Sequence, residues 1–151
     1  MPTGLDRFGA DRSVVAMRVN GELRDLAAAL EDGDTVEPVP VDSDDGRAIV
    51  RHSCAHVLAQ ATQDAFPGAR LGIGPPIENG FYYDSAIDGT FTPDDLADLG
   101  RSMRQIVKAG QRFRRRAVSE AEARAELAAE PYKLELIGLK GQDVARAADG
   151  A

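Results

Sequence analysis

A helical repeat of apolar residues constrains the fold of this 151-residue chain more than any other feature. Its members recur at steps of three and four residues, as one face of an α-helix requires, and a proline and a glycine then stop the run. They are Ile49, Val50, Cys54, Val57, Leu58, Ala61 and Ala65, followed by Pro67 and Gly68. We expect this helix to pack its apolar face into the core.

The same helix carries both histidines of the chain, His52 and His56, four residues apart. At this spacing the two imidazoles rise from one face, one turn apart. With a step of about 100° per residue, that face lies across the helix from the apolar stripe and continues through Gln60 and Gln63. The pair therefore faces either solvent or a second wall, which would form a cleft. Cys54 points about 160–200° away, which makes it a poor partner for the imidazoles.

Two histidines at this spacing suit either a metal ion or an acid–base task. The metalloprotease motif needs a glutamate after the first histidine, and Ser53 at that position excludes it. Zinc would need further ligands, and the spacing of Glu78 and Asp84 does not support them in that role. We predict no metal and favour acid–base use, since an unperturbed imidazole titrates near pH ~6.5.

Composition indicates an ordinary globular protein, with 43% hydrophobic and 28% charged residues. No apolar run approaches a membrane span, and the single cysteine cannot form an internal disulfide, so we expect a cytoplasmic location without membrane contact. The net charge of −7 opposes extensive wrapping of nucleic acid, yet Arg101–Arg116 contains seven basic residues and no acidic one. That segment either contacts a phosphate backbone locally or is a solvated face.

Turn and cap signals divide the remaining chain into short strands and capped helices. Further helices are expected after Thr92 and Ser119, because each residue can cap a helix and precedes a carboxylate by three positions. The first of these helices has an apolar stripe of Leu96, Leu99, Met103, Ile106 and Val107. Strands are expected at 14–19, 22–26, 35–39, 69–73, 81–83, 113–118 and 132–137, with tight hairpin turns at Asn20-Gly21 and Asn79-Gly80. This order of elements predicts an α+β fold.

Several runs resemble bacterial threonyl-tRNA synthetases over roughly Gly9 to Gly141. Those similar to the start of the editing domain are Arg51–Leu58, Phe66–Pro76 and Glu78–Asp84, with further matches at Pro131–Leu134 and Ile137–Gly141. Arg18–Leu26 is similar to the second half of the small TGS domain, a β-grasp fold, that precedes it. The resemblance implies a truncated β-grasp domain at 1–41, a linker at 42–46, the first portion of the α+β editing domain at 47–142 and a disordered tail at 143–151.

The resemblance implies a role in translation, in an enzyme that joins threonine to its tRNA and hydrolyses serine wrongly attached to that tRNA. Such proofreading is physically expected, because one methyl group gives only about 1–3 kcal/mol of discrimination. Carried over to this sequence, His52 and His56 would line the editing pocket and position or activate water, and Lys133 would match a pocket lysine. The partner would be tRNA, with phosphate contacts from Arg112, Arg114, Arg115 and Arg116.

The sequence also departs from the family pattern. It ends before a second pair of the family pocket, a cysteine followed four residues later by a histidine, and before the ligase domain that binds ATP. We therefore expect no cofactor, and a second chain would complete the pocket of an active module. Three interpretations stay open: an editing hydrolase, a non-catalytic tRNA-binding or synthetase-associated module, and a truncated gene product without independent function.

Overall fold

The structure is a computed structural model that describes residues 1–112 and 116–148, with side chains as far as Leu139. Its helices and antiparallel strands confirm the predicted α+β class. The chain divides into two compact units, Met1–Ala55 with Pro75–Tyr82, and His56–Gly74 with the residues from Tyr83 onward. Helix α2 (Asp44–Ala65) contributes to both units. No helix in the described ranges is long and apolar enough to cross a membrane.

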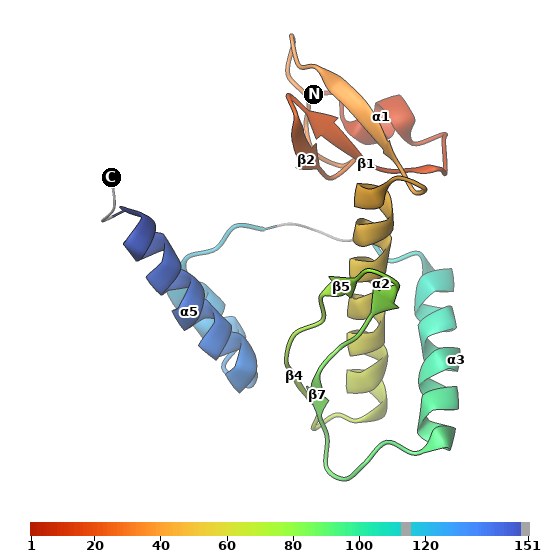
Figure 1. The fold of residues 1–151 in the computed structure, drawn as a ribbon, viewed down its shortest axis with the longest axis vertical. Coiled ribbons are helices and arrows are strands. Elements are labelled where there is room, and N and C mark those ends of the chain that lie inside the picture. The colour runs from red at the N-terminus through yellow and green to blue at the C-terminus, as the bar shows by residue number, and fades with distance from the viewer. Residues whose placement is uncertain (113–115, 149–151) are drawn as a thin grey trace. The chain divides into compact units, whose positions relative to one another are not determined.

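The first unit contains an antiparallel sheet of three strands in the order β2-β1-β3 (Figure 1). The strands are β1 (Val14–Val19), β2 (Glu22–Arg24) and β3 (Val36–Pro40). The predicted hairpin between β1 and β2 is confirmed, because Asn20 and Gly21 both have positive φ, 53° and 87°, as this tight turn requires. Pro38 lies in an edge strand, where its missing N–H removes no ladder hydrogen bond.

Met17 forms the centre of the first unit and is completely buried, and its neighbour Ala16 and Val39 from β3 are buried beside it. Helix α1 (Gly4–Phe8) starts with a capping box between Thr3 and Asp6 and packs against β1. A Cβ on Gly4 would lie 2.5 Å from the Met17 sulfur, so only glycine permits this approach. The assignment of this sheet to a TGS domain stays a prediction.

The polar segment expected as a linker at 42–46 instead leads directly into α2, whose first residue is Asp44. The Ser43 hydroxyl accepts a hydrogen bond from the N–H of Gly46 at 3.0 Å and donates to the carbonyl of Pro40 at 2.6 Å. A Cβ on Gly46 would lie 1.9 Å from that carbonyl oxygen, so the helix starts directly against the end of β3. Serine followed by aspartates is therefore a helix cap here, with acidic charge at the positive end of the helix dipole.

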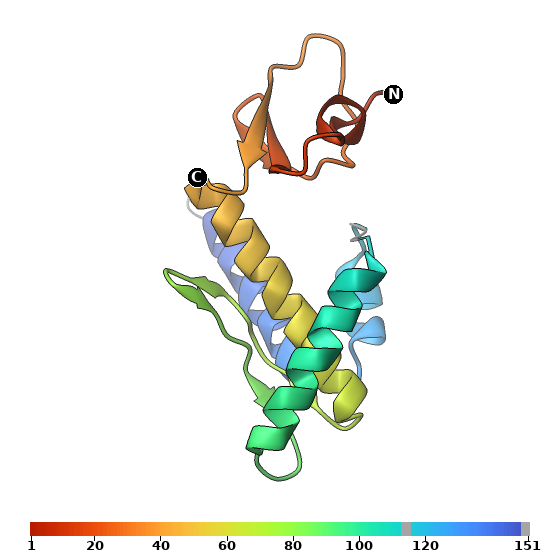
Figure 2. The ribbon, with the colours of Figure 1, turned by 90° about the vertical axis from the view of Figure 1, so that its right-hand side faces the viewer.

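The second unit contains the end of α2, a two-stranded pair and three further helices (Figure 2). Strands β4 (Arg70–Leu71) and β7 (Ser85–Ala86) pair antiparallel, and the helices are α3 (Pro93–Ala109), α4 (Glu120–Glu126) and α5 (Pro131–Ala148). Both predicted helix caps are confirmed by capping boxes at Thr92 and Ser119. Figures 1 and 2 both show α3 beside the second half of α2.

The apolar stripe of α3 is covered only in its middle. Leu99 is buried and Met103 and Ile106 are half-buried, whereas Leu96 and Val107 are 60% and 64% exposed. The periodicity identified the correct side of the helix, but the length of the buried stretch depends on what the helix packs against.

The predicted hairpin turn at Asn79-Gly80 is wrong by one residue. Strands β5 (Pro76–Ile77) and β6 (Gly80–Phe81) pair with Ile77 opposite Gly80, so the turn consists of Glu78 and Asn79. Gly80 is a strand residue and is not among the glycines with positive φ. The return strand ends at Phe81, one residue into the stretch 81–83 expected as a strand.

The strand predicted at 132–137 is also wrong, because these residues lie in α5. Alternation favours a strand, but six residues are too few for the pattern alone to exclude a helix. Two local features decide for the helix. Pro131 occupies its first position, and the carbonyl of Glu130 accepts hydrogen bonds from the N–H groups of Lys133 and Leu134 at 3.0 and 3.1 Å.

Two further predicted segments need correction or fall outside the described ranges. Of the strand expected at 113–118, residues 113–115 lie outside the described part of the chain, and residues 116–118 are not in a strand. The disordered tail expected from residue 143 is helical as far as Ala148, where the description of α5 ends.

Candidate active site

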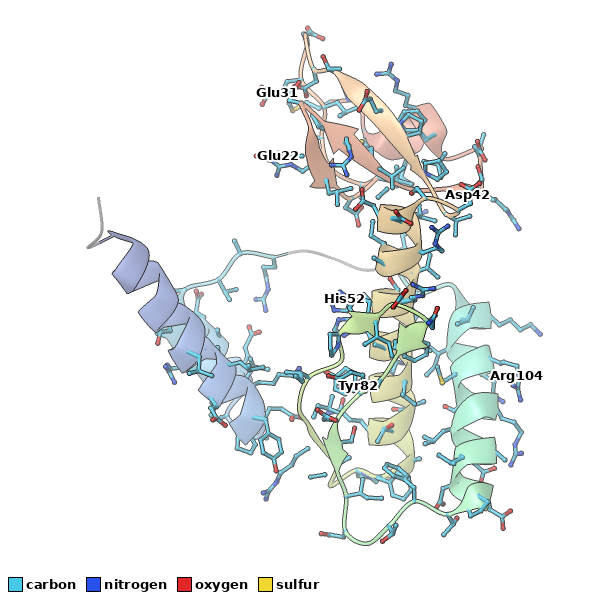
Figure 3. The ribbon with its side chains drawn as sticks, viewed as in Figure 1. Glu22, Glu31, Asp42, His52, Tyr82 and Arg104 are labelled. Atoms are coloured by element: carbon cyan, nitrogen blue, oxygen red, sulfur yellow. The ribbon has the colours of Figure 1, made fainter. Side chains whose placement is uncertain are left out.

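The two histidines lie on α2 as predicted, one turn apart. His52 belongs to the first unit, His56 to the second, and both side chains are exposed. Figure 3 shows His52 on the stretch of α2 alongside the β5–β6 hairpin, which belongs to the same unit. Ala55 and Ala59, which border the imidazole row on the helix, are 0% and 4% exposed. Helix α2 is therefore buried next to the imidazoles, on a flank that the predicted apolar stripe did not include, whereas within that stripe only Ala61 is buried.

In the second unit, the ring of His56 contacts the ring of Tyr83. The two rings meet edge to face, with their centroids 6.3 Å apart and an interplanar angle of 66°. Gly74 makes room for the phenol ring, because a Cβ at that position would lie 2.2 Å from the nearest ring carbon. From the sequence, Tyr83 was expected only as the last residue of a strand at 81–83. Its role could not be read from spacing, because Tyr83 leaves the hairpin and contacts residues distant in sequence.

Lys133, from the first turn of α5, reaches the same tyrosine. Its Nζ donates hydrogen bonds to the carbonyl oxygen of Gly72 at 2.7 Å and to the hydroxyl oxygen of Tyr83 at 2.9 Å. The ammonium lies 5.3 Å from the ring centroid, within the range of a cation–π contact, and its hydrogen bond places it near the hydroxyl end of the ring. The second unit thus joins two of the three predicted catalytic residues, His56 and Lys133, through Tyr83.

This cluster retains hydrogen-bond donors for a ligand. An ammonium has three N–H donors, and within the described residues Lys133 uses two of them. The Tyr83 oxygen accepts from Lys133, which leaves the phenolic proton to be donated. One ammonium N–H and one phenol O–H can therefore stabilise negative charge that develops on an oxygen atom. The imidazole of His56 stands next to the ring that carries this phenol and can transfer a proton.

A cavity of about 490 Å³ lies next to this cluster and shares Gly72 with it. Its wall is formed by the residues that follow β4, by β7 and by α5, and includes Ile73, Asp84, Tyr132, Glu135 and Leu136. The lining is largely apolar, and its charged members are two carboxylates with no lysine or arginine. This cavity is therefore unsuited to phosphate groups.

Of the four predicted RNA-binding arginines, the structure describes two. Arg112 is exposed after the end of α3, while Arg114 and Arg115 lie outside the described residues. Arg116 donates to both carboxylate oxygens of Glu126, at 2.6 and 2.7 Å, although the pair is largely exposed and therefore weak. The described residues contain no group of three or more histidine, cysteine, aspartate or glutamate side chains that could hold a metal ion.

Comparison with known proteins gives highly similar curated relatives, among them several threonine–tRNA ligases. The chain is 64% identical over 138 residues to the protein of Parafrankia sp. (strain EAN1pec), a match covering 91% of this chain and 21% of that protein. It is 64% identical over 140 residues to the protein of Thermobifida fusca (strain YX), covering 93% and 21%. For Leifsonia xyli subsp. xyli (strain CTCB07) the values are 63% over 143 residues, 95% and 21%. No family model matches the chain, which spans about one fifth of the length of these relatives.

Proposed function

Because the chain is homologous to one part of threonine–tRNA ligases, as its motifs predicted, we propose that it works in translation as one wall of an editing site. The substrate would be threonine tRNA that carries serine as an ester on its terminal ribose. A cytoplasmic location follows from that role. The observation that supports this proposal most strongly is the contact of both His56 and Lys133 with Tyr83.

The proposed chemistry is hydrolysis of the ester. The His56 imidazole takes a proton from a water molecule as the water oxygen bonds to the ester carbon. Negative charge then develops on the carbonyl oxygen, where the remaining N–H of Lys133 and the O–H of Tyr83 can stabilise it. The bond between the ester carbon and the ribose oxygen breaks, and the ribose oxygen recovers the proton. The products are free serine and a tRNA with an unmodified 3′ end.

His52 extends this proposal without being required by it. It lies one turn before His56 on the same exposed row of α2, where it would contact the substrate or the water molecules around the substrate. We expect a second chain to supply the opposite wall, because hydrolysis needs a positioned water and charge stabilisation at the same time.

The test is release of serine from serylated threonine tRNA by the purified chain. His56→Ala and Lys133→Ala are expected to lower the rate by about 100-fold, within the usual range for a general base or a charge-stabilising donor. Arg12→Ala, which removes an exposed cation from the first unit, is the control and should release serine at the unchanged rate. If the intact chain releases no serine, even with a separately expressed far half of a related editing domain, the proposed hydrolysis is refuted.

Non-catalytic tRNA binding is the second candidate function. Arg104 and Lys108 are exposed on α3, where Figure 3 labels Arg104, and the exposed Arg112 follows the helix. These side chains could neutralise phosphates. Binding of uncharged tRNA that weakens steeply with salt, without serine release, would favour this function over hydrolysis.

A further inference from the structure

Glu130 connects three elements around the candidate active site. It immediately precedes α5, and its side chain is half-buried. One carboxylate oxygen accepts a hydrogen bond from the side-chain amide of Gln63 on α2 at 2.9 Å, and the other accepts the N–H of Leu71 in β4 at 3.0 Å. The charge is thus held by two neutral donors, and no salt bridge among the described residues includes it.

Glu130 and Lys133 bind adjacent backbone groups. Glu130 binds Leu71, and Lys133, one helical turn later, binds the adjacent residue Gly72. The backbone carbonyl of Glu130 also accepts the N–H of Lys133, so the same residue fixes the first turn of α5. Hydrogen bonds to two adjacent residues, Leu71 at the end of β4 and Gly72 directly after it, therefore fix both the position and the rotation of that turn.

We infer that Glu130 is a positioning residue for Lys133: it locks the start of α5 against β4 and α2, so that the lysine ammonium meets Gly72 and Tyr83. A purely stabilising contact at this place would need no charge, and an apolar side chain could join α5 to the core. A carboxylate instead fixes the orientation of the helix start relative to β4 and α2, because both of its oxygens must meet their donors. The significance of this lock for catalysis rests on the proposed function, whereas its effect on the Lys133 contacts does not.

The test uses resonances that report directly on the ammonium contacts. The carbonyl ¹³C of Gly72 and the ring ¹³Cζ of Tyr83 are measured in the folded chain, and Lys133→Ala defines their positions when the ammonium is absent. Glu130→Ala should move both resonances most of the way to those positions. Glu130→Gln should keep them near wild type, because a glutamine can still accept the Leu71 N–H and a reoriented Gln63 amide can complete the second hydrogen bond. Asp64→Ala, an exposed carboxylate beside Gln63, should move neither.

The outcomes separate this inference from the proposed function. If Glu130→Ala leaves both resonances at their wild-type positions, the inference is wrong, whatever the catalytic result. Moved resonances in a chain that releases no serine would refute only the hydrolysis. Where serine is released, Glu130→Ala should lower kcat with little change in KM, and Glu130→Gln should restore most of it. If Glu130→Ala unfolds the chain, Gln63→Ala decides: an intermediate displacement of both resonances supports the inference, and none overturns it.

Discussion

Replacement of Gly74 by alanine is the sharpest way to disturb the Tyr83 cluster without touching a residue that carries chemistry. The new methyl group would lie 2.2, 2.6 and 2.9 Å from three carbons of the Tyr83 ring. Gly74 is not among the glycines with positive φ, so the backbone conformation itself accepts alanine. The clash with Tyr83 is therefore the only expected source of an effect.

The size of the displacement follows from these distances. Ordinary van der Waals contact starts at 3.4 Å, so the ring must retreat by about 1.2 Å from its present 2.2 Å contact. The closest carbons include Cγ at 2.9 Å, so rotation of the ring about its own axis cannot relieve the clash. We expect a displacement of this size to lengthen or break the Lys133–Tyr83 hydrogen bond, which is now 2.9 Å long. We expect a loss of about 1–3 kcal/mol in the free energy of unfolding and of about 100-fold in serine release.

Urea denaturation, the Tyr83 ¹³Cζ resonance and the serine release assay together measure this effect. The matched control is Gly68→Ala, where an added Cβ has nothing within 4 Å. Both substitutions reduce the entropy of the unfolded chain to a similar degree, so their difference isolates the clash. A Gly74→Ala chain with the stability of Gly68→Ala and an unchanged Tyr83 resonance would refute the assigned packing of Tyr83.

Three further predictions concern the rest of the chain. Met17→Ala should lower the free energy of unfolding by about 2–5 kcal/mol in urea denaturation, because this side chain is 0% exposed; a loss below that range would contradict its central place in the first unit. The Thr92 hydroxyl and then its N–H hold the pKa of Asp95 below its usual value, so the contribution of this capping box is complete at neutral pH and is lost as the pH falls through the folded pKa. The difference in Tm between wild type and Asp95→Asn should therefore be larger at pH 7 than at about pH 3, and an equal difference at both would contradict the linkage. If the chain binds tRNA through phosphates, Arg112→Ala should reduce the slope of log affinity against log salt by about 1, and a salt slope equal to that of wild type would exclude this residue from the contact.

The features that were predicted correctly from sequence are determined by interactions between residues close together in the chain. The Asn20-Gly21 turn needs two positive φ values, which this pair adopts readily, and the Thr92 cap needs only a carboxylate three residues later. The prediction of a turn at Asn79-Gly80 was wrong because a second strand register was available, in which Gly80 enters β6 opposite Ile77. Local chemistry fixed the first hairpin uniquely and left a choice of register in the second.

The candidate site was only partly predictable, because most of it depends on contacts between distant segments. Helical spacing singled out His56 and motif similarity added Lys133, while the roles of Tyr83 and Glu130 were found only in the structure. Lys133 and Tyr83 are separated by 50 residues, and Gln63 and Glu130 by 67. No periodicity or capping rule acts over such distances, and a single sequence contains no signal that pairs these side chains.

The mistaken strand at 132–137 has a direct consequence for the charge of the site. In a strand, Lys133 and Glu135 would point to the same side, and the carboxylate would lie beside the ammonium. In the helix the two side chains are turned about 200° apart, so Glu135 lines the neighbouring cavity while Lys133 binds Gly72 and Tyr83. The ammonium thus binds Gly72 and Tyr83 without a competing carboxylate from its own segment beside it. A proline and a glutamate at the start of α5 therefore decide more than a secondary structure: they decide whether the lysine lies beside Glu135 or binds Gly72 and Tyr83.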